Sequence, residues 1–278
     1  MRFDTEAEAR LMEAVRDIAG DEILPRFRAL DAVDSATKAS ADDLVTLADE
    51  RAEARIEEAV AAILPGAAVV GEEAVSSGRT PLATIVDADL AVIVDPVDGT
   101  WNFANGLAVF GVIVAVTERG ETIWGGIYDP IGDDWVIARK GVGAHFVTRA
   151  GHRRALSLAP GPTAIADAFG YVHTFLFKGD DLRRIAALQP EFRRVGNLRC
   201  SAHEYRLAGE GRVDFILSPK LNPRDHAAGV LIATEAGGVA RLFDGRPYAP
   251  TIHNGSTLLV ARNEALWQAV RARLDFLA

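Results

Sequence analysis

The pattern of apolar and polar residues changes along the chain, and each pattern predicts a different kind of element. Near the N-terminus, apolar residues recur every three or four positions, which predicts amphipathic helices over residues 5–18 and 41–64. Thr5 is expected to cap the first helix and Gly20 to end it, and Pro65 is expected to stop the second. The chain therefore opens with a pair of amphipathic helices.

Short apolar runs and alternating segments follow, and both are typical of strands. Two apolar runs, at residues 67–70 and 91–94, predict short buried strands. The next part of the chain has the pattern of an antiparallel meander. Its strands are expected over residues 109–117, 122–128, 134–138 and 143–147.

A polar stretch over residues 151–162 is the expected passage between two halves, because it carries the run Pro160-Gly161-Pro162. Beyond it, strands and helices alternate, which favours an α/β arrangement. We therefore predict an N-terminal α+β half with an antiparallel sheet over residues 1–150 and a C-terminal α/β half over residues 151–278, which together form one unit. In the second half, strands are expected over 163–169, 213–217, 239–243 and 257–261, and helices over 180–188, 201–209, 226–236 and 264–276.

Composition and charge narrow the classes of function. The chain has 278 residues and a formal net charge of −9, and its arginine-rich pieces are short, so direct binding of nucleic acid is not expected. The longest apolar run, residues 107–116, is interrupted by Gly111 and is too short for a membrane helix. The single cysteine, Cys200, excludes an intramolecular disulfide. Because the first residues lack the basic start and apolar centre of a signal peptide, a cytoplasmic location is expected.

Acidic side chains follow both short apolar runs. Glu72 and Glu73 come after the first run, and Asp95 and Asp98 come after the second. Asp-Pro and Asp-Gly pairs are also common in plain turns, so the second segment alone leaves both interpretations open. Carboxylates that converge at neighbouring strand ends would raise one another's pKa values, and a divalent cation would relieve their repulsion. Magnesium is the expected ion, because all the candidate ligands are hard oxygens.

The predicted elements also suggest roles for residues 99–102 and for Asp225. Gly99 allows the backbone to approach a ligand closely, and Thr100 or Asn102 is expected to cap a helix whose free N–H groups point at an anion such as phosphate. Asp225 precedes the predicted helix 226–236 and, taken alone, is explained as its N-cap.

Three motifs, in the right order, resemble those of the inositol monophosphatase family of magnesium-dependent, lithium-sensitive phosphatases. The segment Asp95 to Phe103, DPVDGTWNF, resembles the family's metal-binding signature, and Gly71-Glu72-Glu73 resembles its GEE. Residues 225–229 and 234–238 resemble its WDxAAG and TEAGG. The resemblance covers most of the chain. It implies an α+β fold, a layered αβαβα sandwich of the inositol monophosphatase and fructose-1,6-bisphosphatase type, with a metal site between the halves, and a homodimer.

The resemblance also implies roles for single residues. The implied ligands of two or three Mg²⁺ ions, most of them in the N-terminal half, are Glu72, Asp95, the carbonyl of Val97, Asp98 and Asp225. The implied catalytic residues are Glu72, Thr100 and Asp49, with Asp49 orienting the threonine hydroxyl. The implied substrate-binding residues are Asp98, Gly99, Thr100 and Ser218, with backbone N–H groups of Gly99 and Thr100 cradling the phosphate.

The sequence departs from the family pattern near the expected pocket. Arg224 stands where the family usually has tryptophan, and Ser218 stands where animal members have an acidic residue that contacts inositol hydroxyls. Around Asn197 and Cys200 the family's Gly-Ser/Thr-Ala-Ala pattern is lost. A strict preference for inositol monophosphate is therefore not expected.

The function predicted from these residues is a magnesium-dependent phosphomonoesterase, similar to inositol monophosphatase, that hydrolyses a small soluble phosphate ester. Histidinol phosphatase, 3',5'-bisphosphate nucleotidase and fructose bisphosphatase remain open as alternatives with the same fold. An alternative of a different class is a scaffold protein that partners transcription or RNA-processing machinery, as the resemblance to some bacterial members implies.

Overall fold

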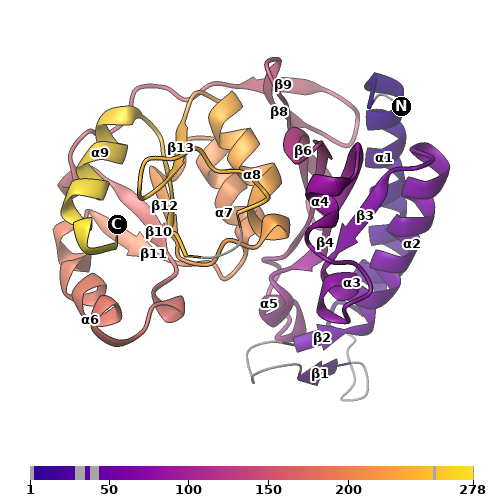
Figure 1. Cartoon of the computed structure of the whole chain (residues 1–278), viewed down its shortest axis with the longest axis horizontal. Helices are drawn as coiled ribbons and strands as arrows, with labels where there is room; N and C mark the ends of the chain where they lie inside the picture. Colours follow the sequence, from indigo (N-terminus) through magenta and orange to yellow (C-terminus); the bar gives the residue numbers. More distant parts are fainter. Residues whose placement is uncertain (1–2, 29–34, 38–43, 253–254, 278) are drawn as a thin grey trace.

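Two β-sheets alternate with layers of helices in the computed structural model, which describes residues 3–28, 35–37, 44–252 and 255–277 (Figure 1). The longer helices are α1 (Thr5–Ile18), α2 (Leu47–Ile63), α6 (Gly179–Leu188), α7 (Ser201–Gly209), α8 (Pro223–Glu235) and α9 (Glu264–Arg273). Helices α1 and α2 cover the outer face of the first sheet, α7 and α8 lie between the sheets, and α6 and α9 cover the outer face of the second (Figure 1). The predicted αβαβα sandwich is confirmed.

The first sheet is the predicted meander with one parallel strand added at its edge. Its seven strands lie in the order β3-β4-β5-β6-β7-β8-β9, and β3 runs parallel to β4 while all later neighbours are antiparallel. The strands span Ala68–Gly71 (β3), Leu90–Asp98 (β4), Gly111–Glu118 (β5), Glu121–Asp129 (β6), Asp134–Arg139 (β7), Gly143–Val147 (β8) and Arg153–Leu156 (β9).

Strand β9 lies inside the polar stretch that the sequence predicts to be a passage between halves. It pairs with β8 at the sheet edge, and three of its four side chains are exposed, so it has almost no apolar pattern. The meander therefore extends to Leu156, because the backbone of β9 still pairs with β8 although its side chains no longer show an apolar pattern.

The second sheet is mixed. Its order is β11-β10-β12-β14-β13, in which β10 is parallel to β11 and β12, and β14 is antiparallel to β12 and β13. The strand predicted over 163–169 is wrong: residues 165–167 form an exposed 3₁₀ turn, and the strand begins only where side chains become buried. The strands span Phe169–Val172 (β10), Arg194–Gly196 (β11), Phe215–Ser218 (β12), Val239–Leu242 (β13) and Leu258–Ala261 (β14).

The N-terminal helices differ from the prediction at their ends. The N-cap of α1 is Asp4 rather than Thr5, since the Asp4 carboxylate accepts a hydrogen bond of 2.9 Å from the N–H of Ala7. Gly20 does not end the helical path, which continues as a π-helical turn because Ala19 and Ile23 remain buried. The predicted start of the second helix at residue 41 lies outside the described residues.

Short elements complete the first half. Before α2 the chain forms a strand rather than the predicted helical turn, and this strand pairs antiparallel with an earlier one. The short elements are β1 (Ser35–Thr37), β2 (Leu44–Thr46), α3 (Glu72–Ser76), α4 (Thr84–Asp87) and α5 (Thr100–Ala104). Among the described helices, none is both long and apolar enough to cross a membrane.

The carboxyl end of β4 is where the first sheet meets the helices between the sheets. The Asp98 carboxylate accepts a hydrogen bond of 2.6 Å from the N–H of Ala202 in the first turn of α7. The Asn102 side chain donates to the carbonyl of Leu198 at 2.8 Å. Since α8 is also buried between the sheets, its N-terminal turn comes to the same place. Residues far apart in the sequence are thus brought together there.

Candidate metal and phosphate site

Strand β4 delivers its acidic residues to the site and then turns sharply at Gly99. The strand is buried from Leu90 to Val97, as its apolar run predicts. Gly99 has a φ of +90°, and a Cβ there would lie 2.8 Å from the carbonyl oxygen of Val109. Only glycine fits both the left-handed backbone and the close approach. This turn aims the next helix, α5, across the end of the strand.

The caps predicted for α5 are wrong. Gly99 occupies the N-cap position, and no side chain caps the helix. The Thr100 hydroxyl donates to the carbonyl of Val97 at 3.0 Å, and the Asn102 amide donates to Val109 at 2.9 Å and to Leu198. Both polar side chains therefore stabilise the turn and its neighbours.

Three predicted ligands meet at this point. One carboxylate oxygen from each of Asp95, Asp98 and Asp225 can be chosen so that all three lie within 4.8 Å of one another. Asp225 is not the N-cap of its helix: Asn222 is, and Asp225 lies inside the first turn of α8, held by a 3.0 Å hydrogen bond from the Asn222 amide. The sheet and the helix between the sheets thus contribute to one cluster.

Burial and mutual repulsion disfavour the charged forms of the carboxylates in this cluster. Burial raises the pKa of Asp95 well above its ordinary value, and the nearby carboxylates of Glu72 and Asp98 raise it further. Burial, and then the charge of Asp225, raises the pKa of Asp98 to about 7. The Oδ1 atom of Asp95 is buried and has no hydrogen-bond partner among the described residues. A divalent cation would satisfy this oxygen and neutralise the charge, and an all-oxygen donor set suits Mg²⁺.

Arg224 lies among the predicted ligands. Its Nη2 donates to Glu72 Oε1 at 3.0 Å, and its Nε lies 3.7 Å from Asp95 Oδ2 and 3.6 Å from Asp225 Oδ1. The guanidinium therefore ties Glu72 to the aspartates and offsets part of their charge. The sequence carries one signal of this role. A basic side chain in the first turn of a helix is disfavoured by the helix dipole, so an arginine at this position is unusual.

Glu53 holds the backbone of the turn that carries Glu72, a role that the sequence does not predict. Glu53 is buried in α2, and its two carboxylate oxygens accept hydrogen bonds of 2.8 Å from the N–H groups of Glu73 and Ala74. A Cβ at Gly71 would lie 2.2 Å from the Glu53 Cδ, which explains the glycine of the GEE motif. The only sequence signal was an acidic residue on the apolar face of the helix.

Asp49, the predicted partner of Thr100, is buried one turn before Glu53 in α2. Because the Thr100 hydroxyl gives its one proton to the Val97 carbonyl, orientation of Thr100 by Asp49 stays a prediction.

A pocket of about 200 Å³ opens beside the carboxylate cluster. All four predicted substrate-binding residues line it. Its lining contains Asp98, Gly99, Thr100, Trp101, His173, Phe175, Leu176, Arg199, Cys200, Ser201, Ser218, Lys220, Asp225 and His226. Two of the predicted metal ligands, Asp98 and Asp225, and the expected substrate-binding residues therefore share one cavity.

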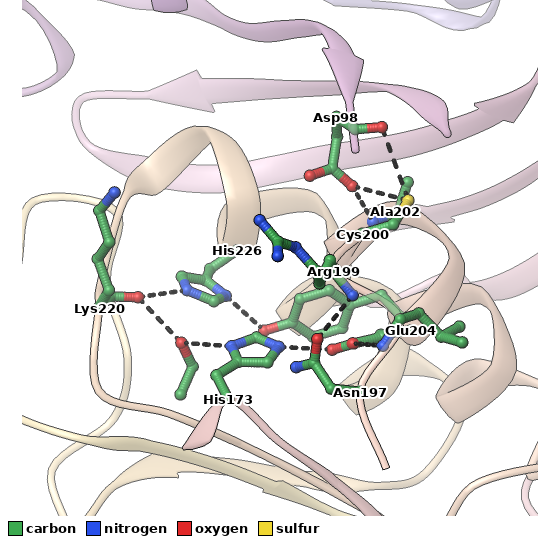
Figure 2. Close-up of polar contacts among 12 residues, drawn as sticks. Asp98, His173, Asn197, Arg199, Cys200, Ala202, Glu204, Lys220 and His226 are labelled. Carbon is green, nitrogen blue, oxygen red and sulfur yellow. Dashed lines mark hydrogen bonds and ion pairs between the residues drawn. The ribbon is translucent and has the colours of Figure 1, made fainter. Parts of the chain in front are cut away.

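A buried hydrogen-bond network supports the floor of this pocket (Figure 2). His173 donates through Nε2 to Glu204 at 2.6 Å and contacts the Ser218 hydroxyl through Nδ1 at 3.2 Å. Burial alone would lower the pKa of His173, but the charge of Glu204 overrides it and the pKa is raised. The Ser218 hydroxyl donates to the Lys220 carbonyl at 3.1 Å, and His226 donates to the same carbonyl at 2.6 Å.

The sole cysteine also belongs to this site. The Cys200 thiol donates to Asp98 Oδ2 at 3.2 Å, and burial together with the Asp98 charge raises its pKa well above the ordinary value. The thiol therefore acts as a hydrogen-bond donor to a predicted metal ligand.

Comparison with known proteins agrees with this geometry. The family model described as "Inositol monophosphatase family" matches residues 4–274. The chain belongs to the inositol monophosphatase family. It is 31% identical over 207 residues to the fructose-1,6-bisphosphatase/inositol-1-monophosphatase of Thermotoga maritima, covering 73% of each chain, and 32% identical over 234 residues to the Nus factor SuhB of Escherichia coli, covering 82% of each.

A solved structure of an IMPase/NADP phosphatase in complex with Mg²⁺ and phosphate has the same fold. Its TM-score is 0.80 at 18% identity, over 96% of this chain and 94% of that one. Membership of the family identifies the chain as a phosphatase of the inositol monophosphatase superfamily, whose members depend on metal ions.

Proposed function

We propose that this protein is a Mg²⁺-dependent phosphomonoesterase that hydrolyses a small phosphate ester in the manner of an inositol monophosphatase. The observation that carries the proposal is the cluster of Asp95, Asp98 and Asp225 at the edge of a 200 Å³ pocket. The family, and the Mg²⁺ and phosphate held by the solved IMPase/NADP phosphatase, support it.

The residues present fit two or three Mg²⁺ ions. Glu72, Asp95, the Val97 carbonyl, Asp98 and Asp225 would hold them. Support comes from the carboxylate oxygens of Asp95, Asp98 and Asp225, which lie within 4.8 Å of one another, and from the buried Asp95 oxygen that is left for a further partner. When bound, the ions would lower the pKa of water and stabilise charge on the phosphate oxygens. The protein's own part is to fix these carboxylates. The Ala202 N–H and the Asn222 amide donate hydrogen bonds to Asp98 and Asp225, and Glu53 accepts from the two backbone N–H groups that follow Glu72.

Residues at the carboxylate cluster and along the pocket would act on the water and the ester. Glu72 would accept the proton of the attacking water, and the Thr100 hydroxyl would orient that water by a hydrogen bond, with Asp49 as the proposed partner of Thr100. Backbone N–H groups of Gly99 and Thr100, both at the pocket wall, would receive the phosphate. Ser218 lies deeper in the wall, where it would contact the leaving group.

The test is hydrolysis of inositol 1-phosphate and of p-nitrophenyl phosphate with and without Mg²⁺. We expect both esters to be hydrolysed with Mg²⁺, and we expect EDTA to abolish turnover and added Mg²⁺ to restore it. Asp225→Asn should need more Mg²⁺ for half-maximal rate. Full activity after exhaustive chelation would overturn the metal-dependent mechanism.

A scaffold role is the second candidate, because the E. coli relative is named a Nus factor. A role of that kind would show as specific capture of transcription proteins from lysate by the purified chain at moderate salt. We further propose a homodimer in the cytoplasm, for which the mass in solution by light scattering and cell fractionation are the measurements.

A further inference from the structure

We infer that His173, held by Glu204, is a positioning residue that makes the Ser218 hydroxyl a hydrogen-bond acceptor toward the pocket. The inference rests on the proposed function and adds which polar group of the ester this part of the pocket recognises. His173 and Ser218 line the same pocket as Asp98, but His173 lies well away from Asp98 in Figure 2, on the side of the leaving group. The group that Ser218 would bind is a hydroxyl of the leaving group that donates a hydrogen bond.

The side chains of this network are closed off from solvent. His173 is 7% exposed, Ser218 is 2% exposed and Glu204 is 0% exposed. A buried donor or acceptor that lacks a partner costs free energy, because no water replaces the missing hydrogen bond. Each proton and each lone pair of these three side chains must therefore find a partner in the protein or on the ligand.

Glu204 fixes the protonation of His173. Its Oε2 lies 2.6 Å from Nε2 of the ring. Burial lowers the pKa of His173, but the charge and the hydrogen bond of Glu204 outweigh burial, and the pKa is raised; Asp225 and Asp98 act in the same direction. A protonated ring carries an N–H at both nitrogens, so Nδ1 donates to the Ser218 oxygen at 3.2 Å.

The carbonyl of Lys220 takes the proton of the Ser218 hydroxyl, at 3.1 Å. The same carbonyl accepts from Nε2 of His226 at 2.6 Å, and Nδ1 of His226 accepts from the Tyr205 hydroxyl at 2.9 Å. A carbonyl oxygen has two lone pairs, and both are used here. The Lys220 carbonyl therefore holds the Ser218 proton in place and is itself fully paired.

Glu204 is used inside the protein and does not line the pocket. Its Oε1 accepts the Leu198 N–H at 2.8 Å, and the Leu198 carbonyl in turn accepts the Asn102 amide at 2.8 Å. The carboxylate thus joins His173 to the loop that packs against α5. Because its two oxygens are both paired, Glu204 acts on a ligand only through His173.

One lone pair of the Ser218 oxygen remains for the ligand. The hydroxyl proton is held by Lys220, and another lone pair receives the Nδ1–H of His173. A hydroxyl of the leaving group donates to the remaining lone pair without disturbing the network. An ether oxygen has no proton to give, and Ser218 would have to withdraw its own proton from the Lys220 carbonyl to bind it.

The test compares three esters that differ in one group, hydrolysed with Mg²⁺ at about pH 6.5, where a histidine of raised pKa is mostly protonated. They are cyclohexyl phosphates that carry a hydroxyl, a methoxy or a methyl group on the ring carbon opposite the ester. We expect kcat/KM of the hydroxyl ester to exceed that of the other two by about ten- to a hundredfold, mainly through KM. A methoxy ester as good as the hydroxyl ester, or three equal values, would overturn the inference.

Variants connect the preference to the named side chains. Ser218→Ala removes the acceptor, so the three esters should become equal. His173→Leu combined with Glu204→Gln removes the imidazole without leaving a bare buried carboxylate, and the hydroxyl-to-methoxy ratio should fall, because Ser218 is then held by one partner fewer. His145→Gln is the matched control, because His145 lies on β8 and does not line the pocket, and it should keep the wild-type ratio. A wild-type ratio in the double variant would show that His173 does not position Ser218.

Binding of inert phosphonates separates this inference from the proposed function. If no ester is hydrolysed with Mg²⁺, the proposed function fails, and calorimetry with the (4-hydroxycyclohexyl)methyl and (4-methylcyclohexyl)methyl phosphonates still decides what Ser218 recognises. Binding of the hydroxylated phosphonate at least about tenfold more tightly, lost in Ser218→Ala, supports the inference. Equal affinities contradict it.

Discussion

Replacing Arg224 with tryptophan, the usual residue of the family, should tighten Mg²⁺ binding. The guanidinium holds Glu72 Oε1 at 3.0 Å and lies 3.6–3.7 Å from oxygens of Asp225 and Asp95. These carboxylates are also the proposed ligands of the ions. Mg²⁺ must therefore compete with a cation that the chain itself supplies, and the variant removes that competitor.

The contacts of Arg224 give the order of magnitude of the expected change in Mg²⁺ affinity. The hydrogen-bonded contact to Glu72 is worth about 1.5–3 kcal/mol, and the two longer ion pairs add less than about 1 kcal/mol each. Because the Arg224 side chain is 21% exposed, we take about 2 kcal/mol as the part that Mg²⁺ binding must displace. At 1.4 kcal/mol for each factor of ten, the Mg²⁺ affinity of Arg224→Trp should rise about thirtyfold.

The assay is a Mg²⁺ titration followed by calorimetry and by thermal unfolding. Without Mg²⁺, Arg224→Trp should unfold at a lower temperature than the wild type, by about 4–8 °C for 2 kcal/mol, because the carboxylates lose their counter-charge. With saturating Mg²⁺ the gain in stability should be larger in the variant, by mass action. Arg224→Lys, which keeps the charge, should lie closer to the wild type.

The two measurements together can refute the reasoning. If Arg224 only fills space, Arg224→Trp should change stability equally at all Mg²⁺ concentrations and leave the Mg²⁺ affinity unchanged. If Arg224 helps to assemble the site, the variant should bind Mg²⁺ more weakly. Either result would show that the guanidinium is no competitor.

Variants at three further positions test residues that orient groups of the site or hold its backbone. Thr100→Ala and Asp49→Asn should lower kcat by about 10²- to 10⁴-fold while leaving Mg²⁺ affinity nearly unchanged, as steady-state kinetics and Mg²⁺ titration would show; wild-type turnover in Thr100→Ala would refute that role. Glu53→Ala should lower the free energy of unfolding in urea by about 1–3 kcal/mol, because two buried N–H groups of α3 lose their acceptors. Glu53→Gln, which keeps one acceptor oxygen, should lose less, and equal stability of all three proteins would contradict the role of Glu53.

Elements with a strong local signal could be predicted from the sequence. Strand β8 spans Gly143–Val147 and α7 spans Ser201–Gly209, the bounds that alternation and helical periodicity predict. Strand β9 could not be found in this way, because an edge strand needs backbone partners but few apolar side chains. The π-helical turn at residues 19–23 could not be predicted from local sequence either. Gly20 lowers the helix propensity, but burial of its neighbours decides the conformation.

The residues of the site also differ in whether a local sequence pattern predicts them. Asp95 and Asp98 could be predicted because a buried strand that ends in carboxylates must present them at the sheet edge. Glu53 and Arg224 could not be assigned, because each acts through a contact with residues 20 and 152 positions away in the chain. Periodicity reports which face of an element is buried, but not which partner a buried charge finds. The left-handed backbone of Arg199 likewise depends on its tertiary surroundings.

Two departures from the family pattern, Arg224 and Ser218, change charge in the same direction. Arg224 puts a cation in place of tryptophan, and Ser218 removes an acid. A chain with a net charge of −9 repels anionic esters at long range, so the pocket must reverse the field locally. Within a narrow cleft, charges separated by less than the Debye length are little screened, and they outweigh the distant surface. Both substitutions act in that direction, because each makes the field around the carboxylate cluster and its pocket more positive.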